Sequence, residues 1–291
     1  MAAAQIGCVP GDVAANIELH LQAIEQARAQ GVDLLVFSEL SLTDYESRPD
    51  TARLARAADC AELRTLAEAG RGMTVVVGFI ERGERGRCFN SCAVLDAGQV
   101  AHVHRKLNLP TYGGLVEGEH YAAGSSLSLA DTPLGRTACL ICADGWNPAI
   151  PWLAALQGAE AMVLPVASSR GAVCPDFDSR AGWRVNLRHT ALTYGVPVIM
   201  TNHAGRRGGL DFWGGSTIVD SHGRVVAEAG REPELLVATL DPADAMLARQ
   251  RLPTVRDAAP RFVLDQLGHL LGGDDRADPS VLPFPTLRRK A

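Results

Sequence analysis

Apolar runs of strand length alternate with helix-like segments along most of this 291-residue chain. The strand-length runs occupy residues 4–8, 33–37, 74–79, 136–142, 161–166, 196–202 and 235–240. The helix-like segments, which carry apolar residues at helical spacing, occupy residues 16–30, 51–69, 150–157 and 180–194. Unbroken apolar runs bounded by turn residues are typical of strands buried on both faces. The alternation therefore predicts an α/β fold.

Two further pairs of short runs flank turn sequences. Residues 91–95 and 100–104 flank Asp96-Ala97-Gly98, and a second pair, at 216–220 and 224–227, flanks Ser221-His222-Gly223. Such pairs predict hairpins, so the sheets should mix parallel and antiparallel strands. From about residue 256 the pattern weakens, and glycines and prolines predict a tail along the surface. We therefore predict one folded domain over residues 1–255 and a C-terminal tail over residues 256–291.

Charge and composition argue against several classes of partner. The formal net charge is −5, and no long block of like charge stands out, which disfavours nucleic acid or an anionic membrane as the main partner. No stretch approaches about 18 uncharged apolar residues, and no secretory signal is recognisable. The chain has seven cysteines, an odd number. Together these features predict a cytoplasmic protein with reduced thiols.

Cys142 stands at the end of a predicted strand. The run Thr137-Ala138-Cys139-Leu140-Ile141-Cys142 is followed by Ala143-Asp144-Gly145 and then by a helix-like segment. Small, turn-prone residues after a buried strand predict a sharp bend that presents the thiol to a pocket. There the N–H of Ala143 could point at a substrate oxygen, and the helix N-terminus would favour the thiolate. Cys142 is therefore a candidate nucleophile.

Two other interpretations of Cys142 stay open on the residues alone. Free cysteine is often simply a buried apolar side chain. Cys139 and Cys142 also form a Cys-x-x-Cys pair, a pattern seen in redox and metal sites. However, residues three apart on a strand point to opposite faces, and no second pair completes a metal site. His102 and His104 share a strand face but offer only two ligands, so we expect no bound metal.

A thiol that attacks an amide needs a base, a group that stabilises the oxyanion and a proton for the leaving amine. Glu39 directly follows the apolar run 34–38, where partial desolvation would make its carboxylate a stronger base. Lys106 follows Val103-His104-Arg105 at another predicted strand end. Taken singly, each charge is more commonly a solvated group at the end of a strand.

Three motifs around these residues occur in a recognisable order: Phe-Ser-Glu-Leu around Glu39, His-Arg-Lys-Leu-Asn-Leu-Pro around Lys106 and Leu-Ile-Cys-Ala-Asp around Cys142. In order, spacing and strand-end setting they resemble the nitrilase superfamily of carbon–nitrogen hydrolases. The similarity extends over about residues 2–255. The loop from Tyr112 to Glu117 resembles the family's loop that carries a second glutamate, and residues 215–223 resemble its late hairpin.

The resemblance implies a four-layer α-β-β-α sandwich with a Glu–Lys–Cys triad. It implies that Cys142 attacks the carbon, that Glu39 is the general base and that Lys106 helps to hold the oxyanion. Glu117 would be the second glutamate, which orients the substrate or supports the triad. Glu119 lies two residues on, and only the family alignment favours Glu117. No metal or organic cofactor is implied.

The sequence departs from the family pattern at two positions. Ser38 stands where a proline usually precedes the glutamate, and Ala149 stands where a glutamate often follows the proline after the cysteine. Neither departure removes a member of the triad, so activity is still expected. Both weaken any transfer of substrate identity from the family.

Several branches of the family share the triad. Nitrile-cleaving members usually carry Trp-Glu after the cysteine, whereas Ala143-Asp144-Gly145 is closer to the amidase-like pattern. No membrane spans of an acyltransferase and no nucleotide-binding half of a synthetase are recognisable. The leading hypothesis is an amidase that hydrolyses a linear amide through a thioester. A hydrolase of N-carbamoyl amines or amino acids comes second, a nitrilase third and a non-catalytic binding protein last. A redox protein would require Cys139 to matter as much as Cys142.

Besides the N–H of Ala143, the candidate substrate-binding residues are Tyr112, Trp146 and Ser168. Further candidates, more common as core or solvent-facing residues, are Trp183, Phe212, Trp213, Arg170 and Arg180. The expected substrate is a small amide or carbamoyl compound. Members of the family commonly pair through helices near the cysteine and through the final tail. The resemblance therefore implies a homodimer or higher homo-oligomer, with residues 256–291 at the interface.

Overall fold

The computed structural model describes residues 1–272, without the side chains of residues 47–49 and 272. The chain divides into two units, Met1–Val255 and Arg256–Ala291. The described part of the second unit contains helix α7 (Pro260–Gly272), which the weakening sequence pattern did not predict. The rest of the predicted tail, residues 273–291, lies outside the described residues. Its place at an oligomer interface stays a prediction.

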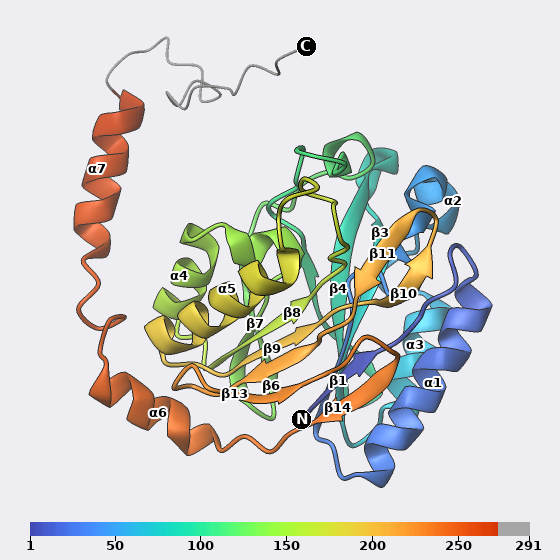
Figure 1. Cartoon of the computed structure of the whole chain (residues 1–291), viewed down its shortest axis with the longest axis horizontal. Coiled ribbons are helices and arrows are strands. Elements are labelled where there is room, and N and C mark those ends of the chain that lie inside the picture. Colours follow the sequence, from blue (N-terminus) through green and yellow to red (C-terminus); the bar gives the residue numbers. More distant parts are fainter. Residues whose placement is uncertain (273–291) are drawn as a thin grey trace. The chain divides into compact units, whose positions relative to one another are not determined.

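Two six-stranded mixed sheets form the centre of the first unit (Figure 1). The first sheet contains β1 (Ala2–Gln5), β2 (Leu34–Phe37), β3 (Thr74–Arg82), β4 (Cys88–Asp96), β5 (Gln99–Arg105) and β14 (Glu234–Val237). The second contains β6 (Leu129–Thr132), β7 (Gly135–Cys139), β8 (Ala161–Pro165), β9 (Val198–Thr201), β12 (Thr217–Val219) and β13 (Val225–Glu228). A separate hairpin pairs β10 (Ala204–Arg207) with β11 (Leu210–Trp213).

The two sheets share one plan. The strand orders are β14-β1-β2-β3-β4-β5 and β13-β12-β9-β8-β7-β6. Strands β1, β2 and β3 run parallel, as do β7, β8 and β9, and their flanking neighbours are antiparallel. The mixed sheets predicted from the hairpin patterns are therefore confirmed.

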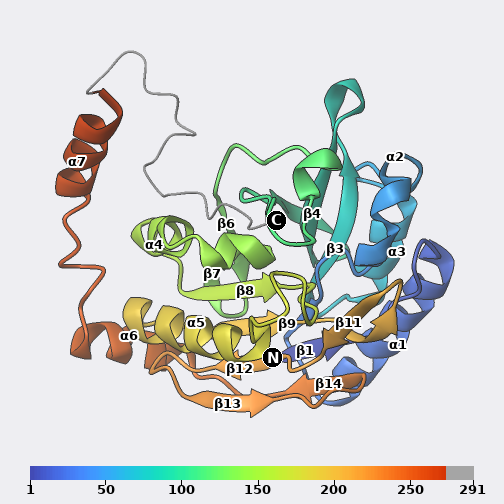
Figure 2. The same cartoon turned by 45° about the horizontal axis from the view of Figure 1, so that its top comes forward.

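Helices cover the outer face of each sheet (Figures 1 and 2). Helices α1 (Val13–Ala29) and α3 (Ala61–Ala69) pack on the first sheet, and α4 (Ala149–Leu156) and α5 (Ser179–Tyr194) on the second. The shorter helices are α2 (Thr51–Leu54), α6 (Pro242–Arg251) and the 3-10 turns Tyr45–Asp50, Glu84–Gly86, Glu117–Glu119 and Cys142–Trp146. The predicted α-β-β-α sandwich is confirmed.

Alternation of side chains along the strands builds these layers. On β2, Leu35 and Phe37 pack against α1 and α3, whereas Leu34 and Val36 pack between the two sheets. Strands β3, β8 and β9 divide their side chains in the same way. Because both faces are covered, every residue of β2 is buried, which explains the continuous apolar run.

The structure differs from the predicted elements where apolar patterning was weak. Segment 51–69 forms α2 and α3 instead of one helix, because residues 55–60 leave the helix and Arg56 bridges to Glu81 on β3. The prediction missed β6, the β10–β11 hairpin and α6. Helix α6 does carry start signals, since Asp241 caps it and Pro242 opens it.

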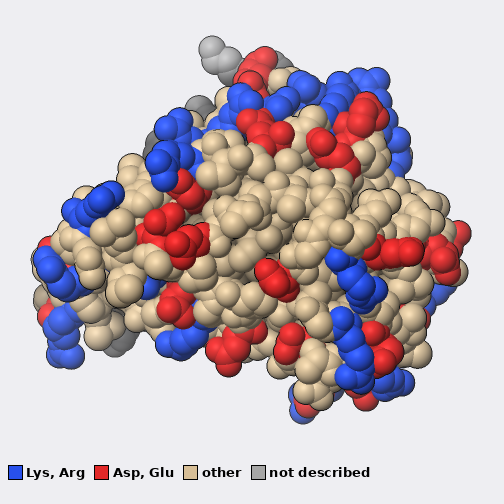
Figure 3. Space-filling view, turned by 90° about the horizontal axis from the view of Figure 1, so that it is seen from below, with Lys and Arg blue, Asp and Glu red and all other residues tan. Residues whose placement is uncertain are grey.

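Charges of both signs are interspersed on the face shown in Figure 3, around a broad uncharged area. This face shows no continuous basic patch of the kind that binds nucleic acid. None of the helices in the described part of the chain combines the length and apolarity needed to cross a bilayer.

Candidate active site

Lys106 is buried between two carboxylates. It directly follows β5, and neither it nor Glu39, which follows β2, has more than 1% of its surface exposed. Its Nζ donates to Oε1 of Glu39 at 2.6 Å and to Oε1 of Glu117 at 2.8 Å. Burial alone would lower the pKa of Lys106, but Glu117 and then Glu39 raise it well above its ordinary value. The ammonium is therefore a fixed positive charge.

The two oxygens of Glu39 have different surroundings. Oε1 accepts hydrogen bonds from Lys106 and, at 2.7 Å, from Nδ2 of Asn90 on β4. Oε2 is buried and makes no hydrogen bond to any residue that the structure describes. One oxygen thus fixes the carboxylate, and the other is left to accept a proton.

Close backbone packing holds the turn that carries Glu39. Leu40 has a positive φ of 52°. The turn lies against Gly78 of β3, where a Cβ atom would meet Leu40 N at 2.3 Å, so only glycine allows this approach. His203 forms a hydrogen bond of 2.6 Å from Nε2 to the backbone oxygen of Glu39. These contacts hold the backbone of the turn and thereby position the Glu39 side chain.

Glu117 is distinguished from its neighbour Glu119 by burial. Glu117 is 1% exposed, whereas Glu119 is exposed to solvent. Besides Lys106, Glu117 binds the hydroxyl of Tyr45, which donates to Oε1 at 2.7 Å. Burial raises the pKa of Glu117, while Lys106 opposes the shift. The structure therefore brings Glu117, and not Glu119, to the lysine.

Cys142 lies at the bend between β7 and α4. It opens the 3-10 turn Cys142–Trp146 and has a positive φ of 46°. Such a φ is uncommon for a residue with a Cβ atom, and strained backbone of this kind clusters at functional sites. The thiol lines a cavity of about 340 Å³ that also reaches Glu117. This is the strand-to-helix bend that the sequence predicts.

The surroundings of Cys142 act on its pKa in opposite directions. Burial and, next, the charge of Glu39 raise the pKa of the thiol well above its ordinary value, and Lys106 only partly offsets them. A helix N-terminus was expected to lower the pKa of the thiol. The turn that begins at Cys142 is a short 3-10 helix, and the charges of Glu39 and Glu117 act in the opposite direction. A raised pKa favours the neutral thiol, which is consistent with attack on a substrate that is assisted by a base.

The raised pKa predicts how alkylation of Cys142 depends on pH. Iodoacetamide reacts with the thiolate, so the rate should rise by about tenfold per pH unit between pH 6 and 8.5. Mass spectrometry of digests after timed exposure would give this rate, with Cys174, an exposed thiol, as a reference in the same digest. A rate that levels off below pH 7.5 would show a resting thiolate instead.

Asp144 joins the nucleophile turn to the segment after Lys106. It is fully buried. Its Oδ1 accepts from the backbone N–H groups of Leu107 and Asn108 at 2.9 and 2.7 Å. Its Oδ2 accepts from the N–H of Ile141 at 3.0 Å and lies 3.1 Å from Nε2 of His104. One carboxylate therefore sets the distance between the chain segments of the two sheets that carry Cys142 and Lys106.

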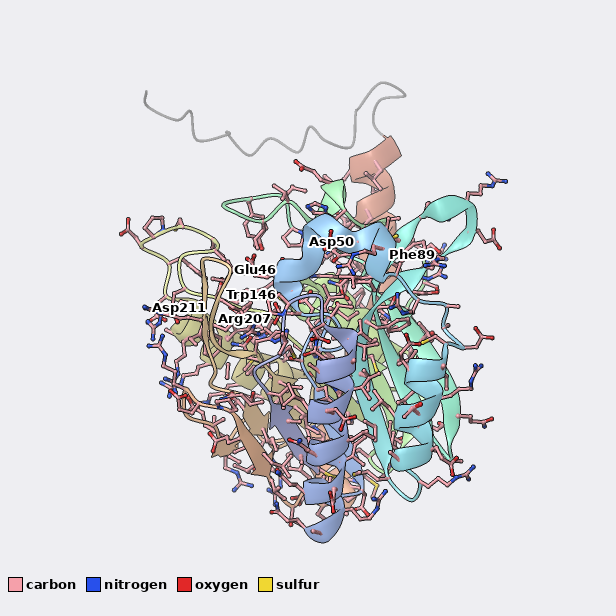
Figure 4. The ribbon with its side chains drawn as sticks, turned by 90° about the vertical axis from the view of Figure 1, so that its right-hand side faces the viewer. Glu46, Asp50, Phe89, Trp146, Arg207 and Asp211 are labelled. Carbon is pink, nitrogen blue, oxygen red and sulfur yellow. The ribbon has the colours of Figure 1, made fainter. Side chains whose placement is uncertain are left out.

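The cavity contains all four predicted binding positions. Ala143, Tyr112, Trp146 (labelled in Figure 4) and Ser168 line it. The remaining lining residues are Tyr45, Pro110, Leu115, Glu117, Cys142, Ala167, Ala172, Val173, Phe177, Ser179 and Trp183. Of the further candidates, only Trp183 lines this cavity. Phe212 is buried outside the cavity, and Trp213, Arg170 and Arg180 line a neighbouring cavity.

The two departures from the family pattern lie in different surroundings. Ser38 is fully buried beside Glu39, and its hydroxyl makes no hydrogen bond to a described residue. Ala149 is exposed at the start of α4 and does not line the cavity. Neither residue disturbs the contacts of Lys106 with its two carboxylates.

Sequence reasoning missed several residues that hold the site. Asn90, Tyr45 and His203 each bond a catalytic candidate, and Asp144 was noted only as a turn residue. The position of Asp144, two residues after the candidate nucleophile, was the one feature of the local sequence that could have indicated its role. Asn90, Tyr45 and His203 lie in segments without a recognisable motif.

One group of three potential metal ligands lies close together among the described residues: Cys8, Asp44 and His203. The guanidinium of Arg207 (labelled in Figure 4) binds the Asp44 carboxylate and lies 2.8 Å from Nδ1 of His203. The arginine already supplies the positive charge that a metal ion would bring. The group therefore acts as structural support for the Glu39 turn.

Comparisons with known proteins identify the family of this chain. The sequence matches the carbon-nitrogen hydrolase family over residues 1–250. A glutamine-dependent NAD(+) synthetase from Thermotoga maritima is 27% identical over 97% of this chain and 49% of its own length. This chain thus spans about half the length of that synthetase. A citrullinase from Francisella tularensis is 28% identical over 86% of this chain and 91% of its own.

A solved structure adds a view of the cysteine in a related protein. It is a variant of the amidase from Nesterenkonia sp. AN1, in which acrylamide has added to the active-site cysteine. It is 25% identical to this chain, with a TM-score of 0.78, and the match covers 91% of this chain and 98% of that one.

Proposed function

The chain belongs to the carbon–nitrogen hydrolase family, and on this premise we propose that it hydrolyses the carbon–nitrogen bond of a small linear amide. One observation carries the proposal: a thiol facing a cavity lies beside a buried cluster of one lysine and two carboxylates. The similarity to an amidase that has a nucleophilic active-site cysteine supports the proposal.

In the proposed first step, Cys142 attacks the amide carbon. Glu39 takes the thiol proton, because the raised pKa favours the neutral thiol and Oε2 of Glu39 is available. The carbonyl oxygen becomes an oxyanion, which Lys106 and the N–H of Ala143 stabilise. Glu39 then gives the proton to the leaving nitrogen. Ammonia or an amine departs, and a thioester remains on Cys142.

The second step reverses these proton transfers with water. Glu39 takes a proton from a water molecule as its oxygen attacks the thioester carbon. The same oxyanion donors stabilise the second tetrahedral intermediate. The carbon–sulfur bond then breaks, Glu39 returns the proton to the sulfur, and the carboxylic acid leaves. No metal or organic cofactor takes part in this scheme.

Glu117, Tyr112, Trp146 and Ser168 complete the proposed site. Glu117 holds Lys106 from the side opposite Glu39 and faces the cavity, so it can also orient the substrate amide. Tyr112, Trp146 and Ser168 enclose the substrate. We assign Glu117 a supporting role because it binds Lys106, and we assign the other three residues to substrate binding because they line the cavity.

Hydrolysis of an N-carbamoyl amine or amino acid is the second candidate function. The similarity to a citrullinase favours it, since citrulline carries a carbamoylated nitrogen. The same triad would attack the carbamoyl carbon. Nitrile hydrolysis and a non-catalytic binding role come after these two.

Ammonia release by the purified chain tests the proposal. The panel contains neutral linear amides, N-carbamoyl amino acids, citrulline and nitriles, each with Cys142→Ala run beside it. Release from amides that depends on Cys142 would support the first candidate, and release from carbamoyl compounds alone would favour the second. Absence of release from every compound, with the protein folded, would contradict both.

Lys106→Met should reduce kcat by about 10²- to 10³-fold, the scale for losing one oxyanion donor. It should also lower the free energy of unfolding by about 3–5 kcal/mol, because two buried carboxylates lose their cation. Steady-state kinetics and urea unfolding would measure the two effects. Arg105→Met is the matched control, since Arg105 pairs with Glu81 outside the cavity. Similar losses of kcat in both variants would contradict the role of Lys106.

We also propose that residues 1–255 form the catalytic domain and that residues 256–291 contribute to a homodimer interface in a cytoplasmic enzyme. Exposed apolar residues on α7, such as Phe262 and Leu270, support such an interface. Light scattering should give the mass of a dimer for the full chain and of a monomer after truncation at Val255. A monomeric full chain at micromolar concentration would contradict this proposal.

A further inference from the structure

The cavity in front of Cys142 has an apolar and aromatic lining. Trp146 packs edge-on against Phe177 and Trp183, with ring centroids 6.2 and 5.0 Å apart. Tyr112, Leu115 and other apolar side chains complete most of the wall. With a volume of about 340 Å³, the cavity suits a small ligand.

The described lining offers no cation to a ligand. Among the described residues around this cavity, Glu117 is the one with a charge; its Oε1 binds Lys106 and the Tyr45 hydroxyl, whereas its Oε2 makes no hydrogen bond to a described residue. Lys106 is fully buried and forms ion pairs with Glu39 and Glu117. Ser168 accepts a hydrogen bond from Nε1 of Trp213 at 3.1 Å.

The nearest arginines to the cavity belong to other ion pairs. Arg180 binds Glu228 at 2.7 Å. Arg170 lies 3.7 Å from Asp211 and is largely exposed. Both line the neighbouring cavity, which shares Phe177 and Ser179 with the first. Within this cavity a substrate carboxylate would therefore meet aromatic rings and no cation, although the buried Nε of Arg180 in the neighbouring cavity makes no hydrogen bond to a described residue.

From this lining we infer that the substrate is an amide whose remaining part is neutral and apolar, of aryl or medium alkyl size. A carboxylate in the cavity would lose its hydration without gaining a cationic partner, which is strongly unfavourable. Flat aromatic walls instead favour rings and alkyl chains. This inference rests on the proposed function and specifies its substrate class.

Matched pairs of amides test the inference. Hexanamide is compared with adipamate, which carries a carboxylate at the far end. Phenylacetamide is compared with its 4-carboxy derivative. We expect kcat/KM for each neutral amide to exceed that of its charged partner by at least about a hundredfold. Equal or better turnover of any charged partner would overturn the inference and leave amide hydrolysis standing.

A pair of variants tests the electrostatic cause. Val173→Lys adds a cation at the half-buried rim of the cavity, whereas Val185→Lys adds the same charge on the exposed face of α5, where Val185 is 71% exposed. The preference for hexanamide over adipamate should fall at least tenfold in the first variant and stay within about twofold in the second. An unchanged preference in folded Val173→Lys would overturn the inference.

Binding separates this inference from the proposed function. Trp146 and Trp183 line the cavity, so their fluorescence should report ligand binding to Cys142→Ala. Phenylacetamide should bind at least tenfold more tightly than its 4-carboxy derivative, whether or not the unaltered enzyme hydrolyses either compound. Turnover of no amide with this binding preference intact would contradict the hydrolase and support the substrate class. Tighter binding of the charged ligand, or binding of neither, would overturn the inference.

Discussion

Replacement of Cys142 by alanine is expected to lower kcat for amide hydrolysis by at least about 10⁴-fold, because no other group in the cavity can form the thioester. The fold should persist, since the thiol makes no structural bridge: all seven cysteines are free. Stopped-time ammonia assays on the folded variant, checked by circular dichroism, would measure the loss. Mass spectrometry of the unaltered enzyme, quenched during turnover, should show an acyl group on Cys142 alone.

Cys139→Ala is the matched control for this loss. Cys139 lies three residues earlier, is buried between the two sheets and does not line the cavity. Its loss should leave kcat/KM within a fewfold of normal while costing about 1 kcal/mol of stability. If both single variants lost activity equally, a redox pair would explain the data better than a nucleophile.

Glu39→Gln is expected to reduce kcat by about 10³-fold, within the range for loss of a general base. The amide is isosteric with the carboxylate, and its oxygen can still accept from Lys106 and Asn90. The amide nitrogen then occupies the position of Oε2, where it cannot take the thiol proton. Binding of substrate should change little, so kcat should fall much more than KM changes.

Glu117→Gln gives the comparison that isolates the base. Both glutamates bind Lys106, and both replacements remove one negative charge from the lysine. If Glu39 is the base, Glu117→Gln should lose only about 10- to 100-fold in kcat, through a misplaced lysine or substrate. Equal losses in both variants, or a larger loss at Glu117, would show that the base has been wrongly assigned.

The triad candidates were predictable because each stands at a strand end with a local motif. The apolar run before Glu39 contains β2, whereas β7 ends at Cys139, three residues before the predicted end at Cys142. The residues that hold them in place were not predictable. Asn90, Tyr45 and Asp144 act through contacts across 51, 72 and about 36 positions of sequence, which no local pattern encodes.

The same limit applies to the fold and the cavity. Strands buried on both faces gave continuous apolar runs, so the central strands of both sheets were predicted. The β10–β11 hairpin contains Ala-Gly-Arg-Arg and offers no such run. Trp183 and Trp213 looked equivalent in the sequence, yet only Trp183 lines the cavity with Cys142. Trp183 lies on α5 and Trp213 on β11, and the place of each element relative to the cavity is set by the tertiary structure.

The position of β1 has a consequence for the order of folding. Ala2 pairs with Leu35 on one side and with Val237 on the other, so β1 joins strands from opposite ends of the first unit. During translation one edge of β1 must therefore wait until residue 237 has left the ribosome, and such an open edge invites wrong pairing. Cys142 is made during this wait, while Glu39 and Lys106 belong to the other, unfinished sheet. Strands β8, β9 and β12 of the second sheet and β14 of the first are all made after Cys142, so the two sheets that carry the site are completed only late in translation.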